Sequence, residues 1–351
     1  MSPPDAFEHA RAVIESGLAS RAFPAAVVDV GGAAGSMWDE AFGRLSYDPA
    51  SSLTTLETIF DLASLTKVIA TASIAMRLVE SQRLAFDHPV GRYLDGFRSA
   101  DRAAVTVRQL LDHSSGLPAH ARIWEQASGR EMYERALSSL PLERAPGTAA
   151  VYSDPGFMLL GFLLEDAGGG TLDAQFAPLA GTLGGPLLYR PPVEWRERIA
   201  PTENDAWRGR VLRGEVHDEN AAALGGVAAH AGLFGTAGAV AAFARLVLTT
   251  FQRETILGTP ATMRTFAQRT GVPGSTRALA WDTMKPTSSC GTRMSPTAIG
   301  HTGFTGTSLW IDWERDRYVV FLTNRVHPTR SNDALVKLRP KLHDAIAQSE
   351  D

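Results

Sequence analysis

The sequence predicts an α/β fold of the α+β type, in which helices flank an antiparallel sheet and a mostly helical region is inserted into the chain. Strand patterns occur at both ends, whereas residues 76 to about 190 contain helical patterns separated by loops rich in Gly and Pro. The chain has 351 residues, more than a single core usually holds. We therefore expect one domain formed by residues 1–75 and 225–351, an inserted region over residues 76–224, and a functional site between them.

The N-terminal end predicts a helix followed by a hairpin. Asp5 and Glu8 have the spacing of a capping box, so a helix should begin here and end near Ser16. Residues 25–30 form an apolar run that stops at two glycines, and residues 36–42 follow. Two short strands on either side of a glycine-containing turn are typical of an antiparallel pair.

The remaining elements follow in chain order. The inserted region contains helical patterns at residues 105–112, 131–139 and 157–167. Near the C-terminus, residues 308–313 and 318–323 flank a charged turn, which predicts a second antiparallel pair. A final helix is expected over residues 331–348, with Pro340 as a kink.

The composition argues against several classes of protein. The formal net charge is −4 and no block of Lys or Arg occurs, so nucleic acid is not an expected partner. Cys290 is the only cysteine, so neither an intrachain disulfide nor a Cys-based zinc site can form. The sequence contains no apolar run of about 18 residues that would predict a membrane span. The N-terminus lacks the basic and apolar regions of a signal peptide, so the expected location is the cytoplasm.

Ser64 and Lys67 carry the first chemical signal. Residues 60–76 look like a buried helix that begins near Ser64, and positions i and i+3 share a helix face about 5–6 Å apart. Lys67 is the only charged residue between Asp61 and Arg77, and burial favours the neutral form of an amine. A neutral amine beside a hydroxyl is a general base beside a nucleophile, and the helix N-terminus suits an oxyanion. Taken alone, Ser64 is also compatible with a helix cap.

Two further motifs follow in chain order. Tyr152-Ser153-Asp154 comes after a Pro-Gly loop, and His301-Thr302-Gly303 precedes the strand at 308–313. With Ser64-x-x-Lys67 ahead of them, the chain resembles the class C β-lactamase and penicillin-binding-protein-like serine hydrolases, including related esterases and D-amino-acid peptidases. That family has Ser-x-x-Lys, then Tyr-x-Asn, then a Lys-Thr-Gly strand. The resemblance covers residues 25–325 and includes the segments 83–90, 110–118, 217–220 and 225–234.

The resemblance implies a β-lactamase/transpeptidase-like fold and a mechanism. Ser64 would attack a carbonyl carbon, while Lys67 and Tyr152 share the base and acid roles. The backbone N–H groups of Ser64 and Phe304 would form the oxyanion hole. The expected substrate pocket is lined by Asp154, His301, Thr302 and Gly303.

Two of these residues depart from the family pattern. Asp154 stands where asparagine is usual, and His301 where lysine is usual. An ionised Asp only accepts hydrogen bonds, and His is only partly charged near neutral pH. We therefore expect an acyl-enzyme hydrolase of esters or amides, including peptidoglycan-like peptides, that acts weakly on β-lactams. A true β-lactamase, a D-alanyl-D-alanine carboxypeptidase and a penicillin-binding sensor without turnover are the alternatives.

Neither a metal nor a cofactor is expected. Residues 217–220 combine His, Asp and Glu, but the sequence contains no His-Glu-x-x-His, and His113, His120 and His230 lack ligand spacing. His113 is expected to pack in the core or to hydrogen-bond behind the site. The sequence contains no nucleotide-binding glycine loop and no Gly-x-Ser-x-Gly elbow. The expected partner is a small-molecule or peptide substrate.

Overall fold

A six-stranded antiparallel sheet organises the structure, a computed structural model that describes residues 6–99 and 101–349. In spatial order its strands are β2 (Gly35–Gly43), β1 (Ala25–Gly32), β11 (Arg317–Thr323), β10 (Ser308–Asp312), β9 (Ile299–Thr302) and β8 (Asp282–Thr283). Both predicted hairpins are confirmed, as β1–β2 and β10–β11. Strand β1 also pairs with β11, so the sheet joins the two ends of the chain.

Both faces of the central strands are covered. Along β1, Val27 points into the core shared with the helical region, whereas Val28 and Val30 point into a second core under the terminal helices. The alternation follows from the two-residue period of a strand. Because both faces are buried, β1 is apolar along nearly its whole length rather than alternating between apolar and polar residues.

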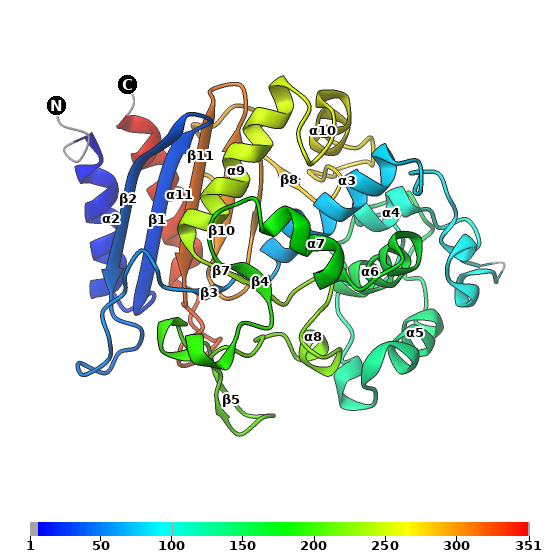
Figure 1. Ribbon diagram of the computed structural model, residues 1–351, viewed down its shortest axis with the longest axis horizontal. Helices are drawn as coiled ribbons and strands as arrows, with labels where there is room; N and C mark the ends of the chain where they lie inside the picture. The colour runs from blue at the N-terminus through cyan, green and yellow to red at the C-terminus, as the bar shows by residue number, and fades with distance from the viewer. Residues whose placement is uncertain (1–5, 100, 350–351) are drawn as a thin grey trace.

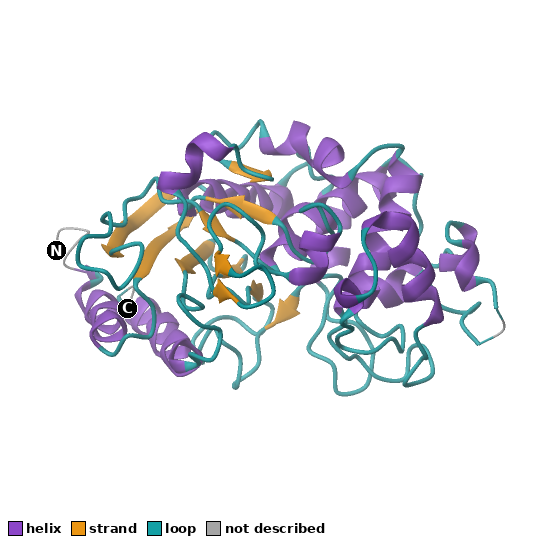
Figure 2. Ribbon diagram, turned by 90° about the horizontal axis from the view of Figure 1, so that it is seen from below, coloured by secondary structure: helices purple, strands orange, loops and turns teal. Residues whose placement is uncertain are grey.

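Three long helices provide this cover. Helices α2 (Glu8–Ala19) and α11 (Ala334–Gln348) lie side by side on one face, and α9 (Ala237–Gln252) lies on the other (Figures 1 and 2). The predicted N-terminal helix is confirmed, although it ends at Ala19 rather than near Ser16. Asp5, the first residue of the expected capping box, lies outside the described residues.

The middle of the chain forms a helical region beside the sheet, at the right of Figure 1. The helices of this region are α4 (Val107–Leu111), α5 (Gly129–Ser139), α6 (Asp154–Gly168), α7 (Leu172–Ala180) and α8 (Glu219–Ala223). Helices α3 (Ala72–Glu80) and α10 (Pro260–Ala267) lie near it. Shorter helical turns are η1 (Lys67–Thr71), η2 (Val90–Arg92), η3 (Asp95–Phe97), η4 (Ile123–Glu125) and η5 (Val193–Arg198). Small sheets combine β3 (Phe60–Asp61), β7 (Leu233–Gly235) and β4 (Leu187–Tyr189), and β5 (Asn204–Asp205) with β6 (Arg210–Val211).

The predicted fold class is confirmed by this mixture of helices and an antiparallel sheet. The main hydrophobic core runs without a break from Val27 and Val320 of the sheet to Phe157 and Leu160 of α6. The proposed division of the chain into residues 1–75 with 225–351 and residues 76–224 stays a prediction. No helix in the described part of the chain is both long and apolar enough to cross a membrane.

Candidate active site

Ser64 lies on a tight turn between strand β3 and the helix that follows. Oδ1 of Asp61, the last residue of β3, accepts a hydrogen bond from the N–H of Ala63 at 2.8 Å. Ala63 has φ 47°, a backbone conformation that is uncommon for residues other than glycine. Such conformations persist where surrounding structure holds them, often at functional sites. Helical structure begins at Leu65, as predicted from the sequence.

Lys67 is the first residue of the π-helical turn η1, and it is fully buried. Its Nζ lies 3.0 Å from Oγ of Ser64, 2.9 Å from the carbonyl oxygen of His230 and 2.8 Å from Oδ1 of Asp154. The contact between Ser64 and Lys67 therefore has the geometry that their spacing predicts. π-Helical turns are rare and are often found at functional sites, but no pattern in the sequence predicted this one.

The charge of Lys67 differs from the sequence prediction. Burial lowers the pKa of this amine, as expected, but Asp154 and Tyr152 outweigh the burial and raise the pKa of Lys67 above its ordinary value. Lys67 is therefore an ammonium ion at neutral pH, and the prediction of a neutral amine is wrong. The error arises because Asp154, which is distant in the sequence, contacts the amine directly.

Tyr152 donates a hydrogen bond from its hydroxyl to Oγ of Ser64 at 2.7 Å. It precedes helix α6, whose N-cap is Ser153. Nδ1 of His113 accepts a hydrogen bond from the N–H of Ser153 at 3.0 Å, and the His113 ring packs on the ring of Tyr152 with centroids 4.7 Å apart. Burial and the charge of Arg277 lower the pKa of His113 well below its ordinary value. A neutral His113 thus holds Tyr152 in place from behind.

Asp154, the first residue of α6, uses both carboxylate oxygens. Oδ1 forms the ion pair with Lys67, and Oδ2 lies 3.1 Å from Nδ1 of His120. Burial alone would raise the pKa of Asp154, but Lys67 and His120 lower it well below its ordinary range. The first turn of a helix also favours a negative charge. Asp154 is therefore ionised, and its charge is balanced by Lys67.

The turn 303–306, which follows β9, is bound to the backbone that leads to Ser64. Oγ1 of Thr305 donates to the carbonyl oxygen of Asp61 at 2.7 Å. Oγ1 of Thr307 donates to the carbonyl oxygen of Leu62 at 3.0 Å. Segments that are far apart in the sequence are thus fixed against each other at the site.

Gly303 permits this close approach. A Cβ atom at this position would lie 2.1 Å from Oγ1 of Thr307 and 2.6 Å from the carbonyl oxygen of Leu62. Phe304, the next residue, lines the same cavity as Ser64. The oxyanion hole formed by the N–H groups of Ser64 and Phe304 stays a prediction that this arrangement allows.

His301 is buried on β9. Its Nδ1 lies 2.8 Å from the carbonyl oxygen of Thr302, and its ring packs against Tyr152 with centroids 5.7 Å apart. Burial, together with the charges of Arg277 and Lys67, lowers the pKa of His301 well below its ordinary value. The expectation of a partly charged His301 is therefore wrong, because the ring stays neutral at physiological pH.

Arg277 brings a positive charge to the cavity wall beside Tyr152. Its guanidinium carbon lies 5.2 Å from the centroid of the Tyr152 ring, and the side chain lines the cavity. Within residues 6–99 and 101–349, no group accepts a hydrogen bond from its buried Nη1. The sequence did not indicate Arg277, because it lies in a loop and in no recognisable motif.

The site opens into a cavity of about 770 Å³. Besides the residues above, it is lined by Thr302, Gly303, His217, Asp218, Glu219, Asn220, Lys285 and Arg325. The predicted site residues Ser64, Tyr152, Asp154, His301 and Phe304 also line it, whereas Lys67 lies buried behind Ser64. Among the described residues, no group of three or more His, Cys, Asp or Glu is placed to hold a metal ion.

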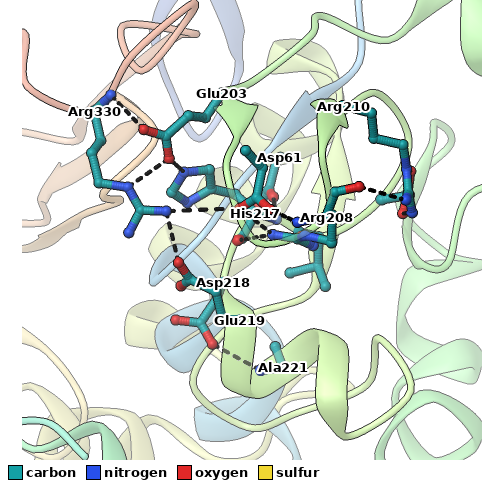
Figure 3. A network of polar contacts seen from close by, with 12 residues as sticks. Asp61, Glu203, Arg208, Arg210, His217, Asp218, Glu219, Ala221 and Arg330 are labelled. Carbon is teal, nitrogen blue, oxygen red and sulfur yellow. Dashed lines mark hydrogen bonds and ion pairs between the residues drawn. The ribbon is translucent and has the colours of Figure 1, made fainter. Parts of the chain in front are cut away.

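A polar network supports one wall of the cavity (Figure 3). Glu203 accepts hydrogen bonds from the backbone N–H and the guanidinium of Arg330, and it lies 3.0 Å from Nε2 of His217. Arg330 also donates to Glu219 at 2.7 Å. The N–H of His217 donates to Oδ2 of Asp61 at 2.6 Å. The network therefore connects this wall directly to the strand that carries Ser64.

Comparisons with known proteins identify the family of the chain. A family model described as Beta-lactamase matches residues 10–341. A protein of Escherichia coli (strain K12) named "Putative D-alanyl-D-alanine carboxypeptidase" is 32% identical over 320 residues, which cover 78% of this chain and 70% of that protein. An N-acetylmuramyl-L-alanine amidase of Bacillus subtilis (strain 168) is 32% identical over 310 residues, 77% of this chain and 68% of that protein.

Solved structures share the fold. EstCE1, a hydrolase with promiscuous acyltransferase activity, superposes with a TM-score of 0.78 at 21% identity, over 98% of this chain and 99% of that one. A penicillin-binding protein homologue from Caulobacter crescentus gives a TM-score of 0.77 at 20% identity, over 98% of each chain.

Proposed function

Because the chain belongs to the beta-lactamase family, whose members are hydrolytic serine enzymes, we propose that it hydrolyses esters or amides through an acyl-enzyme on Ser64. The observation that carries the proposal is the convergence of Lys67 and Tyr152 on Oγ of Ser64, at 3.0 and 2.7 Å. Two donors aimed at one hydroxyl stabilise the negative charge that develops on its oxygen during attack.

The proposed reaction has two stages. Ser64 attacks the carbonyl carbon of the substrate, and its hydroxyl proton passes to the group formed by Lys67 and its neighbours. Burial raises the pKa of Tyr152, although Lys67 acts in the opposite direction, so Tyr152 is protonated at neutral pH. Tyr152 can then protonate the leaving group as its bond to the carbonyl carbon breaks. Water releases the acyl group by the same steps in reverse.

We further propose that the preferred substrates are peptides with a free carboxylate near the scissile amide, as in peptidoglycan-like peptides. Arg277 supports this choice, because its side chain lines the cavity beside Tyr152 and brings a positive charge there. The names of the two curated relatives, a D-alanyl-D-alanine carboxypeptidase and an amidase of N-acetylmuramyl-L-alanine, point to the same class of substrate.

The structure weakens the reason to expect poor β-lactam turnover. That expectation depended on repulsion by Asp154 and on a missing positive charge at His301. Lys67 balances the charge of Asp154, and Arg277 provides a cation beside His301. β-Lactams therefore belong among the test substrates on equal terms with esters.

A labelling experiment tests the acyl-enzyme. A fluorophosphonate probe should add once, mass spectrometry should find it on Ser64, and Ser64→Ala should be inactive but folded. An adduct on another residue, or full activity of Ser64→Ala, would contradict the proposal. A panel of muropeptides, p-nitrophenyl esters and nitrocefin then defines the substrate. A stable adduct with no turnover of any of these would identify a sensor instead of an enzyme.

A further inference from the structure

As an ammonium ion, Lys67 can accept the proton of Ser64 only if it gives up one of its own at the same time. An ammonium group has three protons and no lone pair. Nζ donates hydrogen bonds to Oγ of Ser64 and to the carbonyl oxygen of His230, and it forms an ion pair with Oδ1 of Asp154. The group that finally holds the proton of Ser64 must therefore be another one.

Asp154 is placed to be that group. Its Oδ1 and Oγ of Ser64 both contact Nζ of Lys67, at 2.8 and 3.0 Å, so one nitrogen bridges the nucleophile and a carboxylate. We infer that Asp154 takes up the proton that leaves Ser64, with Lys67 as the link between them. The inference depends on the proposed acyl-enzyme mechanism and deepens it.

The transfer balances without any further reactant. As Oγ of Ser64 forms its bond to the carbonyl carbon, its O–H bond breaks and the proton moves to Nζ of Lys67. At the same time one N–H bond of Lys67 breaks and its proton forms an O–H bond on Oδ1 of Asp154. Lys67 remains an ammonium ion, and the negative charge moves from Asp154 to the carbonyl oxygen of the substrate.

Lys67 and His120 hold the pKa of Asp154 well below its ordinary range, so a proton taken up there is held only during the transfer. His120 contacts the other oxygen at 3.1 Å, so the carboxylate keeps one face toward Lys67 and the other toward the cavity. The ionisable and charged groups that face the pair from the packed elements are Tyr152, His113, His120, Asp218, His230, Arg277 and His301. Of these, Asp218 is already engaged with His230 at 2.7 Å.

The alternative is that Asp154 only holds Lys67 in position. Replacing Asp154 with asparagine distinguishes this positional role from uptake of the proton. An asparagine keeps an oxygen that can hold Lys67 in place, but it cannot take up a proton. It also removes the negative charge that raises the pKa of Lys67. Asp154→Asn should therefore need the free amine of Lys67 as its base, whereas the natural chain does not.

The experiment compares pH profiles of acylation, measured with a p-nitrophenyl ester. In the natural chain, kcat/KM should be flat through neutral pH, because Asp154 is ionised there. In Asp154→Asn it should fall about 10²–10⁴-fold at pH 7, the usual worth of positioned proton transfer, and rise with pH as Lys67 loses its proton. KM should change little. Asp154→Glu should restore the flat profile in part.

Asp282→Asn is the matched control, because Asp282 lines the same cavity and the same atoms change, but its carboxylate accepts hydrogen bonds from Thr276 and Thr283 instead of contacting Lys67. It should keep the natural rate and profile. If Asp154→Asn keeps a rate within tenfold of the natural chain and the same profile, the inference is overturned. Thermal unfolding of each variant shows whether a lost rate comes from a lost fold, and fluorophosphonate labelling shows whether Ser64 is still accessible. Failure to label Ser64 in the natural chain would overturn the proposed function itself.

Discussion

At the scale of single residues, the site depends on charges that neighbouring groups determine. Lys67 is charged because Asp154 contacts it, although burial alone would neutralise it. His113 and His301 are neutral, since both are buried near Arg277 and Lys67. Burial alone therefore predicts the wrong charge for Lys67, residue type alone predicts an uncertain charge for His301, and the contacts decide both.

Arg277→Gln tests carboxylate recognition at this scale. A hydrogen bond to a charged group contributes about 1.5–3 kcal/mol, so kcat/KM for a peptide with a free carboxylate should fall about 10- to 100-fold. Hydrolysis of a neutral p-nitrophenyl ester should change much less. Lys285→Gln, which removes a cation elsewhere on the cavity wall, is the control. An equal loss with both substrates would mean that Arg277 acts on Tyr152 instead.

At the scale of elements, the site depends on the contact between two turns. The turn 303–306 is tied to the approach to Ser64 by the hydroxyls of Thr305 and Thr307. These hydrogen bonds, rather than any single strand, place Phe304 and Ser64 on one cavity.

Gly303→Ala tests that contact. Its Cβ would lie 2.1 Å from Oγ1 of Thr307, so the turns must separate, and displacement of about 1 Å can cost about 10²-fold in rate. We expect kcat to fall by about that factor, with a lower Tm. Gly238→Ala on α9 is the control, since its Cβ would meet nothing within 4 Å. Equal activity of the two variants would mean that the spacing of the turns is unimportant.

Strand β1 carries a second testable feature, the buried carboxyl of Asp29. Burial raises the pKa of Asp29 to about 6, although Tyr318 donates to it at 2.8 Å. In the unfolded chain the pKa is about 3.9. Below about pH 3.9 the Asp29 carboxyl is protonated in both the folded and the unfolded chain. Stability is therefore lost as the pH rises through 6, because the folded chain holds its proton more tightly.

Asp29→Asn should remove this loss. A difference of about two pKa units corresponds to roughly 3 kcal/mol, so the free energy of unfolding should rise by up to that amount at pH 8. Near pH 4 the variant should differ little from the natural chain. Urea unfolding at the two pH values measures both. A less stable variant at pH 8 would show that Tyr318 needs the charged carboxylate.

At the scale of the whole molecule, one core joins the sheet to the helical region, and the site lies where they meet. Local patterns predicted much of this arrangement. The hairpins follow from apolar runs beside turns, and the contact between Ser64 and Lys67 follows from helical spacing. The rest depended on residues that only folding brings together. Arg277 has no periodic or local signature, and the ion pair between Lys67 and Asp154 joins two motifs that no spacing rule connects.

The pairing of β1 with β11 has a consequence for protein synthesis. Ala26 lies opposite Thr323, so the inner edge of β1 has its partner only once β11 has been synthesised. Until then, the nascent chain can form the β1–β2 hairpin but exposes an apolar, unpaired strand edge. His301 and Phe304 also emerge late, so Ser64 is translated long before its pocket exists. The growing chain therefore lacks a complete site, and its unpaired strand edge is exposed to aggregation during this interval.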